Sequence, residues 1–89
     1  MYNKKYILEK IEEFNHHNSI YEGVEGSVCY LAYLNVGERG WFLFVETNGW
    51  YEYAHRIHTS VIRDVEYTDN QVIVTTRNTK LTFTLIKAD

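Results

Sequence analysis

The chain has 89 residues, of which 45% are apolar, with nine Lys and Arg against twelve Asp and Glu, one cysteine and no proline. This length supports one domain with a modest core and leaves little room for a substrate pocket and a cofactor site as well. The formal charge of −3 offers neither the clustered basic charge of a nucleic-acid binder nor the strong acidity of a DNA mimic. We therefore expect a binding or inhibitory module that does not contact nucleic acid, and not an enzyme.

The apolar runs and the cysteine content bear on the cellular compartment. The longest apolar runs, residues 28–34 and 41–45, fall far short of the ~20 residues needed to cross a bilayer. The first residues lead into a charged amphipathic pattern and not into the apolar core of a signal peptide. Cys29 alone allows no internal disulfide. These features predict a cytoplasmic protein with no membrane partner.

The N-terminal segment has the periodicity of a helix. Ile7, Leu8, Ile11 and Phe14 recur at three- and four-residue spacing, while glutamates occupy the other side. The pattern predicts an amphipathic helix over residues 4–16.

From Gly26 onward the apolar residues alternate with a period of two, and turn residues interrupt them at regular intervals. The alternation predicts strands over residues 27–36, 41–47, 50–56, 61–67, 71–77 and 80–86. The expected fold is α+β in a single domain over residues 1–89. The N-terminal helix would pack on a curled antiparallel meander of about six strands, or on a partly open barrel.

Asn48-Gly49 is the strongest hairpin signal in the chain, because a type I′ turn needs positive φ at both positions. A turn centred there places Thr47 opposite Trp50 and Phe44 opposite Tyr53. One face of the hairpin then carries Phe42, Phe44, Tyr51, Tyr53 and His55, and the other carries Trp41, Leu43, Val45, Trp50 and Ala54. Both faces are rich in apolar and aromatic side chains.

Residue types that commonly carry chemistry lack the spacing that the chemistry needs. His55 and His58 are three residues apart at the end of a predicted strand, where odd spacing sends side chains to opposite faces. Cys29 lies in the most apolar strand, as a structural thiol would. We expect no catalytic residue, no metal and no cofactor.

Aromatic residues make up 16% of the chain, more than a core of this size hides easily. Trp, Tyr and Arg dominate the energetics of protein interfaces. We therefore predict a partner-binding surface on the hairpin and the neighbouring strand, formed by Tyr33, Arg39, Trp50, Tyr51, Tyr53, His55 and Arg56. Three alternatives remain open: the rings complete the second face of the sheet, form a homodimer seam, or stack on a nucleotide.

Three short phrases within residues 41–86 carry a resemblance: Val45-Glu46-Thr47-Asn48-Gly49, Thr59-Ser60-Val61-Ile62 and Thr75-Thr76-Arg77-Asn78-Thr79. They resemble phrases of small proteins encoded by phages and mobile elements of low-GC bacteria, a class that includes anti-CRISPR and other anti-defence proteins. The resemblance implies a phage-encoded inhibitor in the host cytoplasm that binds a CRISPR effector or another defence enzyme stoichiometrically. It assigns no functional residue, and the charge of −3 departs from the acidic members that imitate DNA. A nucleotide-sequestering protein and a structural virion or oligomer component are the alternatives.

Overall fold

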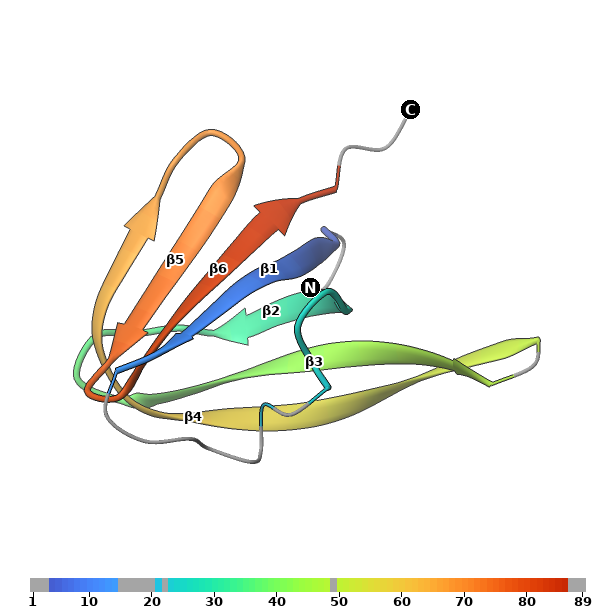
Figure 1. Cartoon of the computed structure of the whole chain (residues 1–89), viewed down its shortest axis with the longest axis horizontal. Coiled ribbons are helices and arrows are strands. Elements are labelled where there is room, and N and C mark those ends of the chain that lie inside the picture. The colour runs from blue at the N-terminus through green and yellow to red at the C-terminus, as the bar shows by residue number, and fades with distance from the viewer. Residues whose placement is uncertain (1–3, 15–20, 22, 49, 87–89) are drawn as a thin grey trace.

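The computed structural model describes residues 4–14, 21, 23–48 and 50–86, with the backbone alone at positions 47, 48 and 52 (Figure 1). All regular structure in this part is β. The strands are β1 (Tyr6–Glu13), β2 (Val28–Tyr33), β3 (Arg39–Asn48), β4 (Tyr51–Tyr67), β5 (Gln71–Thr76) and β6 (Thr79–Leu85). They form a closed antiparallel barrel in chain order, in which β1 lies between β6 and β2. The α+β prediction, with its partly open sheet, is therefore wrong.

The N-terminal helix predicted over residues 4–16 is replaced by β1, and its last two positions lie outside the described residues. β1 pairs along its length with β6, and a bulge at Glu9 interrupts the register. A bulge inserts one extra residue, so the inward side chains change from a spacing of two to a spacing of three. Tyr6, Leu8 and Ile11 accordingly face the core. This spacing in β1 imitates part of a helical stripe.

The strands predicted over residues 50–56 and 61–67 are one continuous strand, the 17-residue β4. Its first part pairs with β3, and from Ile62 onward it pairs with β5. Two irregularities bend it between these partners: one where β4 has two residues opposite Gly40 of β3, and one at Arg63. Between these two irregularities Ile62 is buried and Val61 is exposed.

The core fills the barrel interior. Its fully buried side chains include Phe42 and Phe83, whose rings meet edge to face with centroids 5.2 Å apart, a favoured aromatic geometry. The alternation of the last two strands predicts Val72, Val74, Leu81, Phe83 and Leu85 on one core face; the first four are buried, and Leu85 is half-buried.

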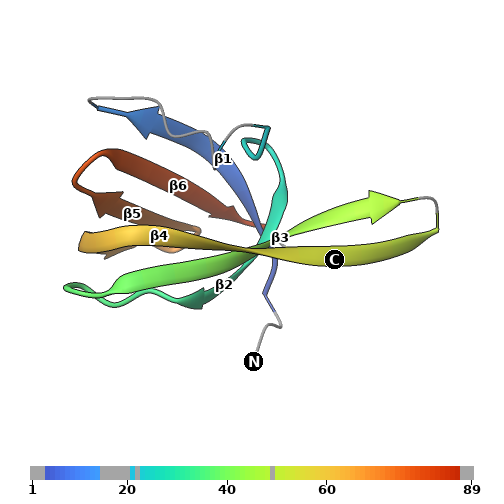
Figure 2. The same cartoon turned by 90° about the horizontal axis from the view of Figure 1, so that it is seen from below.

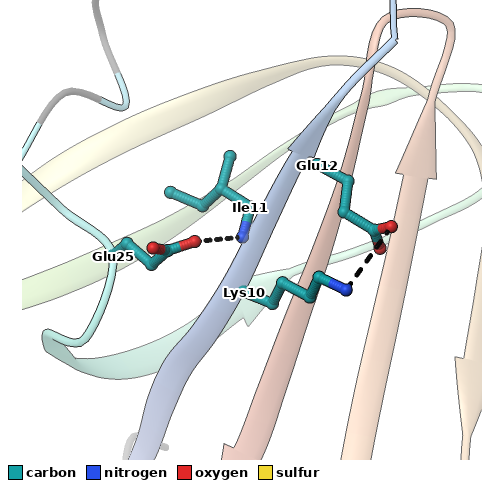
Figure 3. Close-up of polar contacts among 4 residues, drawn as sticks. All are labelled: Lys10, Ile11, Glu12 and Glu25. Atoms are coloured by element: carbon teal, nitrogen blue, oxygen red, sulfur yellow. Dashed lines mark hydrogen bonds and ion pairs between the residues drawn. The ribbon is translucent and has the colours of Figure 1, made fainter.

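The junction between β1 and β2 is short, since only Tyr6 and Ile7 pair with β2. Past these residues, the Ile11 N–H donates to Oε2 of Glu25 at 2.8 Å, as Figure 3 shows. The Leu8 N–H donates to the Ser27 carbonyl and the Leu8 carbonyl accepts from the Gly26 N–H, and beyond these bonds the side chain of Glu25, in the same segment before β2, supplies the acceptor. Lys10 Nζ lies 3.8 Å from Oε1 of Glu12, an exposed ion pair on the same strand (Figure 3).

The β3–β4 hairpin projects from the barrel as a two-stranded ribbon (Figures 1 and 2). β2 reaches β3 only as far as Val45, and β5 meets β4 only from Ile62. We call residues 44–48 and 50–56 the arm. Among the described strands, residues 46–48 and 51–53 of the arm pair only with each other.

Candidate functional site

The register of the arm differs from the predicted one. Phe44 pairs with His55, and Asn48 and Tyr51 form the last pair, so the turn is displaced by one residue on each strand. The residues predicted for each face of the hairpin still lie on that face. A displacement of one residue on both strands leaves unchanged which side chains point to the same side of the ribbon. Cross-strand side-chain pairs help to set register, and this one brings Phe44 against His55. The turn prediction at Asn48-Gly49 could not include such a contact.

One face of the arm carries a continuous row of rings formed by Phe44, His55, Tyr53 and Tyr51, which we call the ring row. The imidazole of His55 stacks on Phe44 with centroids 4.9 Å apart, and Tyr53 meets it edge-on at 5.0 Å. Tyr51 lies tilted to Tyr53 at 6.4 Å. Tyr51 is 58% exposed and Tyr53 40% exposed, so the outer half of the ring row faces solvent.

Glu46 fixes the middle of the ring row. Its Oε2 lies 3.1 Å from Nε2 of His55, and both side chains are nearly half exposed. A hydrogen bond between Tyr53 and Glu46, together with the carboxylate charge, raises the pKa of the Tyr53 hydroxyl. The Tyr53 phenol, which is neutral at physiological pH even at its ordinary pKa, donates this hydrogen bond to Glu46.

The opposite face of the arm has a different character. The guanidinium of Arg56 lies over the ring of Trp41, with Cζ 4.4 Å from the centroid, as in a cation–π contact. Trp50, beyond the last strand pair, is 97% exposed. The arm therefore offers a ring row on one side, an Arg–Trp pair on the other, and a tryptophan near its tip.

Tyr33 and Arg39 lie away from the other predicted binding residues. Arg39 begins β3, roughly 30 Å of strand from the arm tip at about 3.3 Å per residue, and Tyr33 pairs with Trp41, roughly 23 Å from the tip. The Tyr33 hydroxyl donates to the Glu38 carboxylate, with both oxygens 2.9 Å away, and Arg39 Nε donates to the Thr59 carbonyl at 3.1 Å. The structure thus gathers Trp50, Tyr51, Tyr53, His55 and Arg56 on the arm and separates Tyr33 and Arg39 from them.

Sequence reasoning missed two contributors to this surface, Glu46 and Trp41. Neither belongs to the predicted site, because each acts through a neighbour: Glu46 holds His55 and Tyr53, and Trp41 supports Arg56. The correct cross-strand register places Glu46 opposite Tyr53. A sequence prediction with that register would have identified Glu46.

The cysteine, a residue type that can act as a nucleophile or a metal ligand, lies outside the arm, in β2. Cys29 is fully buried, and burial raises the pKa of its thiol to about 12, so it remains a neutral thiol. Among the residues that the structure describes, no three His, Cys, Asp or Glu side chains gather as metal ligands. No helix suited to crossing a membrane occurs in this same part of the chain.

Comparisons with protein-family models, with curated proteins and with solved structures found no match to this chain.

Proposed function

We propose that this chain is a small, non-enzymatic binding protein that engages a protein partner through the arm. One observation carries the proposal: a two-stranded hairpin leaves the barrel and displays Trp50, Tyr51 and Tyr53, which are 97%, 58% and 40% exposed. The core does not account for these rings, because Phe42, Phe83 and their neighbours already fill the barrel. Exposed Trp and Tyr are the side chains that most often anchor protein interfaces.

The internal contacts of the arm support recognition by a surface that is already ordered. Glu46 and Phe44 contact His55, and Glu46 also contacts Tyr53, so these two side chains lose less freedom on binding. The Glu46–His55 pair is open to water, with side-chain exposures of 48% and 45%. Acid–base catalysis gains most where water is excluded, so this exposure favours binding over catalysis.

Within this proposal, the partner is a CRISPR effector or another bacterial defence enzyme, and the protein is a phage-encoded inhibitor acting in the host cytoplasm. Its support is the resemblance carried by phrases such as 45–49 and 75–79. Inhibition would be stoichiometric, because it needs only occupation of a surface.

The test is affinity capture with the tagged protein from a bacterial lysate that contains defence systems, followed by mass spectrometry and a binding titration. We expect one stoichiometric partner. The triple variant Trp50→Ala, Tyr51→Ala, Tyr53→Ala should bind it at least about a hundredfold more weakly, because anchor residues carry most of the binding energy of an interface.

A matched triple variant serves as the control: Val36→Ala, Val61→Ala and Tyr67→Ala, which are 60%, 52% and 67% exposed and lie outside the arm. It should bind the partner as the wild type does. Full affinity in the arm variant, with the fold of both variants intact by circular dichroism, would remove the arm from the proposal.

The ring row favours a second candidate function, sequestration of a nucleotide by stacking. Tyr51 and Tyr53 present exposed rings 6.4 Å apart, and aromatic platforms of this kind stack nucleic-acid bases. A thermal-shift screen against nucleotides and cyclic dinucleotides separates the two candidates, because a ligand that binds only the folded state raises its melting temperature. A rise that disappears in Tyr53→Ala would favour sequestration, and the absence of any rise would leave protein binding.

A further inference from the structure

The outer edge of β4 in the arm is open. Among the described strands, none pairs with β4 on the side away from β3 until β5 begins at Ile62. Asn48 and Tyr51, the last pair, are separated by two positions, and the pair that flanks such a loop exchanges hydrogen bonds. Because bonded and non-bonded pairs alternate, the N–H and C=O groups of Ala54 and Arg56 point to the open edge.

This edge lacks proline and lysine, two of the features that usually prevent strands from pairing. Natural edge strands are interrupted by proline or bulges, or carry lysine. The chain contains no proline, β4 contains no lysine, and the register with β3 is regular between Tyr51 and Ile57. A two-stranded ribbon is also marginally stable in water by itself. An added strand would satisfy the open backbone groups of the arm and stabilise it.

The sequence of β4 favours a second copy of the chain as the occupant of this edge. Antiparallel pairing about a two-fold axis at Ala54 places Tyr53 opposite His55 of the second copy, which extends the ring row across the junction. The same pairing places Arg56 opposite position 52 of the second copy, a glutamate in the sequence. An axis at Arg56 would instead set two guanidinium groups against each other, and like charges directly opposite are destabilising.

We propose that two copies of the chain associate through their β4 edges about an axis at Ala54, forming a four-stranded antiparallel sheet in the order β3–β4–β4–β3. The axis is perpendicular to the sheet, so both ring rows lie on the same side and both Arg–Trp pairs on the other. This self-association goes beyond the proposed function and does not depend on the identity of the partner.

Sedimentation velocity over a dilution series of the purified protein tests the association, and a charge exchange at the axis tests its register. Ala54 is exposed, so Ala54→Lys and Ala54→Glu should keep the fold. Each variant alone should raise the dimer dissociation constant about tenfold or more, because two like charges then meet at the axis. An equimolar mixture, with one variant fluorescently labelled, should restore association, because Lys then faces Glu.

Val36→Lys is the control: it adds the same charge at an exposed site outside β4 and should associate as the wild type does. Three results would overturn the inference: a monomer at every concentration, a dimer indifferent to both Ala54 variants, or a mixture that fails to restore association. Since no partner is added, these outcomes are independent of whether the arm binds another protein.

Discussion

Gly40 occupies a position where neighbouring strands leave no room for a side chain. A Cβ atom there would lie 2.5 Å from the Tyr33 carbonyl oxygen and 2.7 Å from Cδ1 of Ile62. The Gly40 N–H also donates to Oγ1 of Thr59 at 2.9 Å, where Thr59 is only 1% exposed. This single residue therefore lets β2, β3 and the bent part of β4 approach one another.

We expect Gly40→Ala to lower the free energy of unfolding by about 1–3 kcal/mol, the usual cost of overpacking a well-packed interior. Urea denaturation monitored by circular dichroism measures it. Gly37→Asn is the control, because Gly37 has open space around its α-carbon and φ of +89°, a region that Asn tolerates better than other side chains. Equal effects of the two substitutions would contradict the steric argument.

Among the elements, how well the sequence predicts a strand depends on how regular the strand is. β5 and β6 pair without interruption, so their alternation is visible in the sequence. β1 has a bulge at Glu9, and its spacing therefore imitates a helix. Ile7 in β1 and Phe14 just after it, both assigned to the helical stripe, are 37% and 50% exposed. The bulge follows from pairing with β6, far away in the sequence, and no local pattern in β1 reveals it.

The candidate site, like the strands, could be predicted only in part from the sequence. The hairpin signal and the aromatic content are local, so Trp50, Tyr51 and Tyr53 could be assigned to an exposed hairpin from the sequence. The projection of the arm depends on where β2 and β5 stop pairing with its strands. The part played by Glu46 depends on cross-strand register. Both are set by contacts between distant segments, which the sequence pattern does not contain.

The junction of β1 and β2 yields a prediction at the same scale. Glu25→Ala removes the acceptor of the Ile11 N–H and should lower stability by about 1 kcal/mol, typical of one hydrogen bond. Hydrogen exchange measured by NMR should show faster exchange at the Ile11 amide. Glu12→Ala, which removes only an exposed ion pair, should leave that amide unchanged, since such pairs contribute little. If the Ile11 amide exchanges at the same rate in Glu25→Ala as in the wild type, the hydrogen bond from Ile11 to Glu25 does not stabilise the junction.

At the scale of the whole molecule, the protonation of the buried Cys29 thiol makes the free energy of unfolding depend on pH. Burial raises the pKa of Cys29 from 9.0 to about 12, and burial, followed by the charge of Glu13, raises that of Tyr21 above 10.0. A raised pKa in the folded state means that the unfolded chain loses its proton first. The resulting stabilisation is complete below the unfolded pKa and declines as pH rises toward the folded pKa.

Stability should therefore fall above about pH 9, with a slope approaching about 1.4 kcal/mol per pH unit for the one proton that Cys29 retains in the folded state. Denaturation curves recorded between pH 8 and 10 measure the slope. In Cys29→Ala the decline over this range should be much shallower, because Tyr21 begins to contribute only near pH 10. Parallel profiles for the two proteins would show that Cys29 is not responsible.

The pairing of β1 with β6 has a consequence for the order in which the molecule folds. β1 is made before β6, yet it pairs with β6 along its length and with β2 only at Tyr6 and Ile7. A growing chain must therefore hold β1 without its main partner until residues 79–85 have emerged. Closure across so long a loop is entropically costly and slow. The barrel can therefore close only after β6 has been made, and until then the incomplete chain exposes an unpaired β1 edge to chaperones.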